Sequence, residues 1–164
     1  MSPLRPDLVE CWVFRLAPGG EVEYLLIRRA PGRVFAGLWQ CVTGGLDPTE
    51  RIPVAALREV EEETGLAGPG IEAFYDLDQV ESFYDEGTDA VVSAVIFAVR
   101  VTASAEAMLS HEHEEARWVT RDEALQLAIW PGYRESFDRI ERFIAKPETA
   151  RWFELSPDGR RLSR

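Results

Sequence analysis

The chain has 164 residues, of which 46% are hydrophobic and 29% are charged. This length suits one domain with a substantial core, and the composition excludes an intrinsically disordered chain. The net charge of −11 argues against binding of a nucleic-acid polymer, because proteins that grip phosphate backbones are usually basic. We find no secretory signal and no apolar run of the ~20 residues that a membrane span needs. We therefore expect a soluble, cytoplasmic protein with no membrane partner.

The first half of the chain predicts three strands and then a helix. The strands are rich in Val, Leu and aromatic residues and are separated by Pro- and Gly-containing turns. They are predicted at residues 8–16, 22–27 and 38–43. Between the last two, residues 28–37 are expected to form a loop, and Gly44-Gly45 is expected to end the third strand. A helix is predicted over residues 53–64, because Pro is common near the start of a helix and Gly just after its end.

The second half predicts a long hairpin followed by helices. Two β-type runs flank a polar, Gly-containing turn, and a shorter run follows them. These strands are predicted at residues 71–84, 90–101 and 116–119. Thr120 is expected to cap a helix over residues 121–128, because Glu123 stands at the third helical position. A last helix, residues 133–146, carries apolar side chains on one stripe.

This order of elements argues for an α+β fold, with a mixed β-sheet between helices in an α/β/α sandwich. We expect a single domain over residues 1–164, with its core at about 8–146 and a tail, 147–164, that forms a small hairpin. Cys11 and Cys41 lack a second Cys or a His at metal spacing and are expected to be buried as small hydrophobic residues. Monomer and homodimer both remain open.

Three glutamates of the predicted helix share one face. At roughly 100° per residue, Glu62 and Glu63 flank Glu59 at about −60° and +40°, whereas Glu61 points away. Like charges at this spacing destabilise a helix by about 0.2–0.5 kcal/mol per pair. Mg²⁺ would remove that repulsion, because it prefers carboxylate oxygens and completes its shell with substrate phosphates. Taken alone, the same charge run is more typical of a solvent-exposed acidic face.

The residues around this helix resemble the Nudix hydrolases. The family's box consists of glycines, glutamates, one arginine and aliphatic residues at fixed spacing. All nine specified positions over 23 residues match without a gap: Gly44, Glu50, Arg58, Glu59, Val60, Glu62, Glu63, Gly65 and Leu66. The loop before Glu50 departs locally, because family members often have a further Glu and a Gly there and this chain has residues 46–49 as Leu-Asp-Pro-Thr.

The resemblance implies the Nudix fold, in which the box forms a loop–helix–loop beside a mixed sheet. It also implies Mg²⁺ or Mn²⁺, held by Glu59, Glu62, Glu63 and the Gly44 carbonyl. Arg58 would orient a catalytic carboxylate, Glu59 or Glu62, through an ion pair, which suits its planar guanidinium. An ordinary surface ion pair is the alternative for Arg58.

A second acidic cluster precedes the predicted strand 116–119. Its Glu112, His113 and Trp118 resemble a pattern of bacterial dATP pyrophosphohydrolases, also described as dihydroneopterin triphosphate pyrophosphatases. In many Nudix enzymes a Glu at this place is a metal ligand or the general base. The resemblance thus makes Glu112 the first catalytic candidate here and Glu115 the second. A zinc site at His111 and His113 lacks a third ligand.

Basic and aromatic residues upstream of the box are candidate substrate contacts. Arg28, Arg29 and Arg33 stand in the loop that faces the box in this fold, and guanidinium groups bind phosphates well. We select Arg28 and Arg33 as phosphate contacts, with charge balance on an acidic surface as the alternative. Trp39 is expected either to stack on a base or to pack in the core.

The sequence therefore predicts a Mg²⁺-dependent pyrophosphohydrolase. Its partner would be a small, nucleotide-like phosphorylated substrate, either a nucleoside triphosphate or a related nucleoside diphosphate compound. Hydrolysis of ADP-ribose, a nucleotide sugar or a dinucleoside polyphosphate is the alternative. A non-catalytic nucleotide-binding domain is more remote, because such domains commonly lose box glutamates and all are present here.

Overall fold

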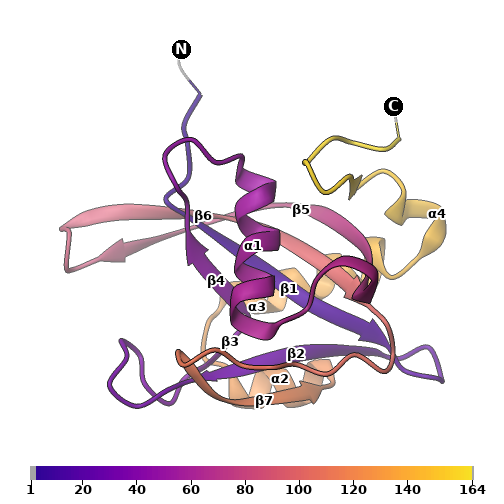
Figure 1. Ribbon diagram of the computed structural model, residues 1–164, viewed down its shortest axis with the longest axis horizontal. Coiled ribbons are helices and arrows are strands. Elements are labelled where there is room, and N and C mark those ends of the chain that lie inside the picture. Colours follow the sequence, from indigo (N-terminus) through magenta and orange to yellow (C-terminus); the bar gives the residue numbers. More distant parts are fainter. Residues whose placement is uncertain (1–2, 164) are drawn as a thin grey trace.

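The computed structural model describes residues 3–163 and shows a mixed β-sheet with helices on both faces (Figure 1). The predicted α+β architecture is confirmed. The strands are β1 (Leu8–Leu16), β2 (Val22–Arg29), β3 (Trp39–Gln40), β4 (Val42–Gly45), β5 (Ile71–Asp85), β6 (Ala90–Val101), β7 (His113–Val119) and β8 (Glu154–Leu155). The α-helices are α1 (Ile52–Thr64), α2 (Arg121–Leu127), α3 (Gly132–Arg139) and α4 (Pro147–Ala150), with a 3-10 turn η1 (Gly68–Gly70) and a π-helical turn η2 (Ile140–Ile144).

Strand β1 organises the sheet, whose order is β3-β2-β1-β6-β5-β8. It pairs in parallel with β6, from Leu8 opposite Ala94 to Phe14 opposite Arg100. Its other edge is shared, because its first half pairs with β4 and its last residues pair with β2. Strand β7 extends the sheet beyond β2. The sheet thus divides beside β1, and β4 leads directly into the loop before α1.

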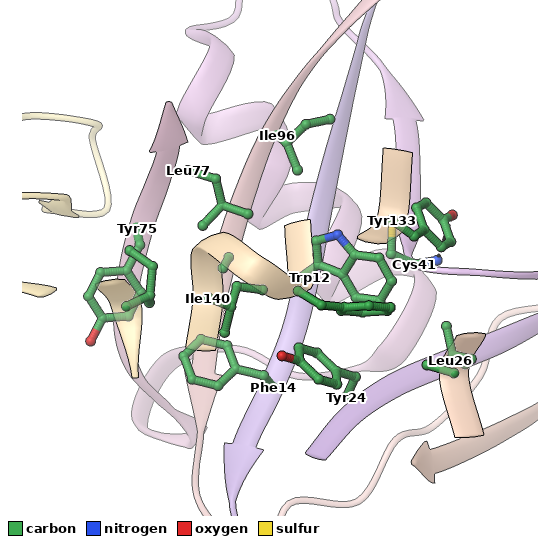
Figure 2. Close-up of a cluster of buried hydrophobic side chains, with 14 of the residues drawn as sticks. Trp12, Phe14, Tyr24, Leu26, Cys41, Tyr75, Leu77, Ile96, Tyr133 and Ile140 are labelled. Atoms are coloured by element: carbon green, nitrogen blue, oxygen red, sulfur yellow. Dashed lines mark hydrogen bonds between the residues drawn. The ribbon is translucent and has the colours of Figure 1, made fainter. Parts of the chain in front are cut away.

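Two apolar clusters lie on opposite faces of this sheet. On the face covered by α2, α3 and η2, the fully buried Trp12 makes an edge-to-face contact with Tyr133, with ring centroids 4.6 Å apart (Figure 2). Trp12 makes a second edge-to-face contact with Phe137, with ring centroids 4.7 Å apart. On the other face, Val60 and two alanines of α1 pack on β1, β4 and β6. Cys11 and Cys41 are both buried and unpaired, as predicted. Among residues 3–163, no helix has the length and apolarity to cross a membrane.

Helix α1 begins one residue before the predicted start and ends where predicted. Pro53 lies in its first turn, and Gly65 adopts φ 70° after the last turn, where its N–H donates to the Glu61 carbonyl. Only glycine takes this left-handed backbone conformation at little cost. Residue 51 precedes the helix in extended conformation, and no side chain caps the first turn.

Several predicted boundaries differ from the structure. The single strand predicted at residues 38–43 is two strands, because β3 pairs with β2 and β4 pairs with β1. Gly44 and Gly45 do not break this segment but belong to β4, opposite Val9 and Leu8. Strand β2 extends to Arg29, and β7 starts at residue 113 rather than 116, because these segments pair around a bulge. The last helix changes to a π-helical turn at residues 140–144 and stops before Pro147.

The tail beyond η2 returns to the sheet. After α4, strand β8 pairs antiparallel with β5, with Leu155 opposite Phe74. A turn over residues 156–160 follows, and Arg161 then forms a bridge with Leu155. The turn over residues 156–160 lies beside the beginning of α1, on the other side of the molecule from α2 (Figure 1).

Replacement of Phe137 by Ala tests the core beneath α3. Phe137 is 0% exposed, so its loss should leave a cavity and lower the free energy of unfolding by about 3–5 kcal/mol. Urea denaturation measures this change. Phe83→Ala is the matched control, because Phe83 is 44% exposed and should cost far less. Equal losses in the two variants would contradict the assignment of Phe137 to the core.

Candidate active site

The box glutamates are placed by a close approach between β4 and α1. Gly44 has no room for a side chain, because a Cβ there would overlap the Glu59 carboxylate. Helix α1 packs Val60 against the sheet, so the face with Glu59, Glu62 and Glu63 turns toward the end of β4. Side-chain exposure then differs along this face, from 58% for Glu62 to 13% for Glu59. A side chain at residue 44 would therefore displace the Glu59 carboxylate from this position.

The Arg58 side chain donates five hydrogen bonds. Three of them go to residues before α1, and two go to glutamates of α1 itself. Its Nε and Nη2 donate to the two carboxylate oxygens of Glu50 at 2.8 and 3.0 Å. Nη1 donates to Glu59 at 2.7 Å and to Glu62 at 3.2 Å. Nη2 also donates to the Gly45 carbonyl at 3.0 Å. The expected ion pair of Arg58 is thus present, and the same guanidinium lowers the pKa of Glu50.

Glu63 is the most buried acid of the cluster, with 4% of its surface exposed. Burial, together with the negative charge of Glu59, raises the pKa of Glu63 to about 8. Its Oε2 atom is buried and has no hydrogen-bond partner among residues 3–163. Such an atom is costly unless a proton or a cation satisfies it. Glu63 therefore fits the donor set of a hard divalent cation, whose ligands are carboxylate oxygens.

Glu59 lies at the electrostatic centre of the acids. Burial raises its pKa, Arg58 opposes this effect, and the charges of Glu62 and Glu112 add to it. Within residues 3–163, no three acidic, His or Cys side chains already form a close metal-ligand group. The four glutamates are thus electrostatic neighbours rather than a preassembled coordination shell.

Glu112 reaches this cluster from the segment before β7. That segment is bound to the end of α1, where the Met108 N–H donates to the Thr64 carbonyl at 2.8 Å and the Ser110 N–H to the Glu63 carbonyl at 3.3 Å. Arg29 donates to the Glu112 carboxylate at 3.1 Å. The charge of Glu112 contributes to the raised pKa of Glu63. These contacts favour Glu112 over the second candidate, Glu115, which pairs with Arg28 and Arg117.

The other selected side chains have local partners. Arg28 forms ion pairs with Glu114 at 3.0 Å and Glu115 at 2.8 Å. Trp39 is 7% exposed and belongs to the core, with the guanidinium of Arg28 5.5 Å from its ring centroid. This burial supports the packing alternative for Trp39. Arg33 is half-buried in the loop after β2, and its role stays a prediction.

Two polar contacts near the site escaped sequence reasoning. Arg29, not the selected Arg28, pairs with Glu112, because the bulge between β2 and β7 places them differently. Gln40 and His113 lie 3.3 Å apart through their Nε2 atoms. Burial and the positive charge of Arg29 lower the pKa of His113 to about 4, so this imidazole is neutral at pH 7. The adjacent Arg28-Arg29 pair was the one signal available in the sequence.

A model of the NUDIX domain matches residues 9–140. The chain belongs to the NUDIX family. The resemblance on which the box was identified is thereby confirmed, and it extends well beyond the box. The matched region runs from β1 to the start of η2 and so includes Arg58, all the acids of the candidate site and Glu112.

This chain is similar to proteins with different names and lengths. It is 38% identical over 123 residues to the octanoyltransferase of Myxococcus xanthus, covering 74% of this chain but only 33% of that protein. It is 29% identical to the nucleoside triphosphatase NudI of Enterobacter sp. (strain 638), covering 70% of this chain and 84% of that protein. A solved NUDIX hydrolase structure from Listeria monocytogenes superposes with a TM-score of 0.71 at 27% identity, covering 84% of this chain and 93% of that one.

The pKa of Glu63 predicts how stability depends on pH in metal-free buffer. Between the ordinary carboxyl pKa of 4.5 and about 8, the folded protein holds a proton that the unfolded chain releases. Stability contributed by this proton is therefore lost as the pH rises through this window. Glu63→Gln should be less sensitive to pH than the wild type from pH 5 to 8, measured by urea denaturation in EDTA.

The exposed Glu61→Gln on the same helix is the control for this comparison. It should retain the pH dependence of the wild type. Identical pH profiles for the wild type and Glu63→Gln would show that Glu63 is not held in a costly buried state.

Proposed function

We propose that this NUDIX domain is a Mg²⁺- or Mn²⁺-dependent hydrolase that cleaves a diphosphate linkage in a nucleoside triphosphate or a related nucleoside diphosphate compound. One observation carries the proposal: a single guanidinium, Arg58, holds Glu59 and Glu62 on the helix that also carries Glu63, whose buried Oε2 has no hydrogen-bond partner among residues 3–163. A cluster built only for stability would not leave a buried carboxylate oxygen without a partner.

The metal would be held by oxygens of the box. The proposed ligands are Glu59, Glu62, Glu63 and the Gly44 carbonyl. A bound divalent ion supplies charge neutralisation at the phosphates and lowers the pKa of a coordinated water. It also removes the repulsion between an anionic substrate and a protein of net charge −11. Arg58 keeps two of the carboxylates oriented, because its planar fork restricts their positions.

The protein's own groups handle the proton. In the proposed reaction, a water oxygen forms a bond to one phosphorus while the bridging P–O bond breaks, and pyrophosphate or a phosphomonoester leaves. Glu112 accepts the water's proton, with Glu59 as the alternative base. The ion pair with Arg29 restricts where the Glu112 carboxylate lies. Of the two selected arginines, Arg33 is the first proposed phosphate contact, because Arg28 already pairs with two glutamates.

Similarity to the nucleoside triphosphatase NudI supports a nucleoside triphosphate as the first substrate to test. ADP-ribose, nucleotide sugars and dinucleoside polyphosphates are the alternatives within the same chemistry. A product profile over a panel of these compounds, with Mg²⁺ and with Mn²⁺, distinguishes them. No turnover on any member would favour the remote alternative, a nucleotide-binding domain without hydrolysis.

Glu62→Gln and Glu63→Gln test the metal assignment. Each substitution keeps the size of the side chain but removes a negative ligand, so kcat on the best panel substrate should fall by about 10²–10³-fold. Phosphate or pyrophosphate release measures this, and thermal unfolding checks that both variants fold. Glu61→Gln, on the same helix but pointing away, should retain activity. Full activity of both test variants with Mg²⁺ would remove these residues from the metal site.

Glu112→Gln tests the proposed base. Loss of the proton acceptor should lower kcat by about 10²–10⁴-fold while metal binding, followed by calorimetry, changes less. Glu115→Gln is the matched control, because Glu115 is engaged by Arg28 and Arg117. If Glu115→Gln is impaired and Glu112→Gln is not, the two candidates are in the wrong order.

A further inference from the structure

The last turn of the chain touches the beginning of the catalytic helix. We propose that this turn, residues 156–160, is a positioning element that holds the first turn of α1 and thereby the geometry of the box glutamates; this inference rests on the proposed function. We call it the tail turn. It lies outside residues 9–140, the region that matches the NUDIX domain, and is therefore a feature of this chain rather than of the family model.

The contact between the tail turn and α1 is close and specific. Gly159 has φ 82°, and a Cβ there would overlap the ring of Pro53, approaching its Cβ at 2.8 Å and its Cγ more closely. One residue earlier, the Asp158 carbonyl accepts a hydrogen bond from Arg51 Nε at 2.9 Å. Gly159 is thus required both by its backbone conformation and by the approach of Pro53.

The helix start depends on such contacts, because no side chain caps it. The loop before α1 is also held from the N-terminal side. Arg5 donates to the Asp47 carbonyl at 3.0 Å and to the Glu50 carbonyl. The two ends of the chain therefore hold the same short loop and the first turn of α1 from different directions.

The tail turn is itself rigidly connected to the sheet. The Ser156 N–H donates to the Arg160 carbonyl at 2.9 Å, and the Gly159 N–H donates to the Ser156 carbonyl at 2.8 Å. Arg161 then bridges to Leu155 and forms an ion pair with Asp76 of β5 at 2.6 Å. The tail turn therefore contacts Pro53 as a part of the structure that is anchored to the β-sheet.

A displacement of the first turn of α1 can be passed to the acids through two hydrogen bonds. Glu50 directly precedes Arg51, and its carboxylate holds Arg58, which in turn holds Glu59. Beyond the first turn of α1, a groove lined by Leu57, Arg58 and Leu155 lies between the helix and β8. The tail turn thus acts at the first turn of α1. Small misplacements of catalytic groups reduce turnover strongly.

Gly159→Ala is the direct test, and Gly20→Ala is its matched control. Gly20 has nearly the same backbone conformation, φ 84°, but nothing lies within 4 Å of an added Cβ. Both variants carry the same backbone strain, and only Gly159→Ala pushes on Pro53. We expect Gly159→Ala to lower kcat on the best panel substrate by about tenfold with little change in KM, and Gly20→Ala to retain kcat.

Hydrogen exchange supplies a readout that does not need activity. Amides of residues 46–64 should exchange faster in Gly159→Ala than in Gly20→Ala at equal distance below each melting temperature. If the wild type hydrolyses nothing but this difference appears, the proposed function fails and the positioning role stands. If the wild type is active and neither kcat nor exchange separates the two variants, the positioning role is wrong.

Pro53→Gly is a second test, because it removes the ring that an added Cβ at residue 159 would overlap. In a Pro53→Gly background, Gly159→Ala should have no further effect on kcat, because the overlap is gone. An unchanged tenfold loss in that background would overturn the contact as the cause. If Gly159→Ala does not fold, Arg51→Met removes the bond to Asp158 without adding bulk, and a normal kcat and normal exchange in that variant would contradict the proposal.

Discussion

The guanidinium of Arg58 is the interaction on which the candidate site depends. It offsets part of the repulsion among three carboxylates, and it connects the loop before α1 to the face of the helix. Burial makes the ionised form of Glu63 expensive, and the positive charge of Arg29 offsets this effect only in part. Stability and chemistry therefore conflict at Glu63, as is common where a site is prepared for a ligand.

The fold keeps the unfavourable Glu63 carboxylate in place by fixing helix α1 at three points. Helix α1 is fixed at its middle by the packing of Val60, at its end by the segment that carries Glu112, and at its beginning by Pro53. A helix held at three places keeps its acidic face in position although that face opposes folding. The β-sheet supplies the common support, because β4, β6 and β8 all connect to these contacts.

Local patterns in the sequence were sufficient to predict the helix and its acidic face. They could not predict which distant segments pair with one another. The flanking Pro53 and Gly65 predicted α1 to within a residue, because these signals act locally. The strand through Gly44 and Gly45 was missed, because pairing with β1 outweighs the weak strand preference of glycine. The Arg29–Glu112 ion pair lies beside a bulge that the sequence does not reveal. The contact of Gly159 with Pro53 joins residues far apart in the chain.

The parallel pairing of β1 with β6 has a consequence for how the protein acquires its shape. Leu8 pairs with Ala94, so the central ladder cannot close until more than half of the chain is available. Contacts of such large sequence separation slow folding, because loop-closure entropy is lost before they form. During synthesis, the acidic helix would leave the ribosome well before β6, one of the three strands on which it packs. We expect its final docking to be a late, cooperative event, with chaperone dependence rising when β6 is weakened.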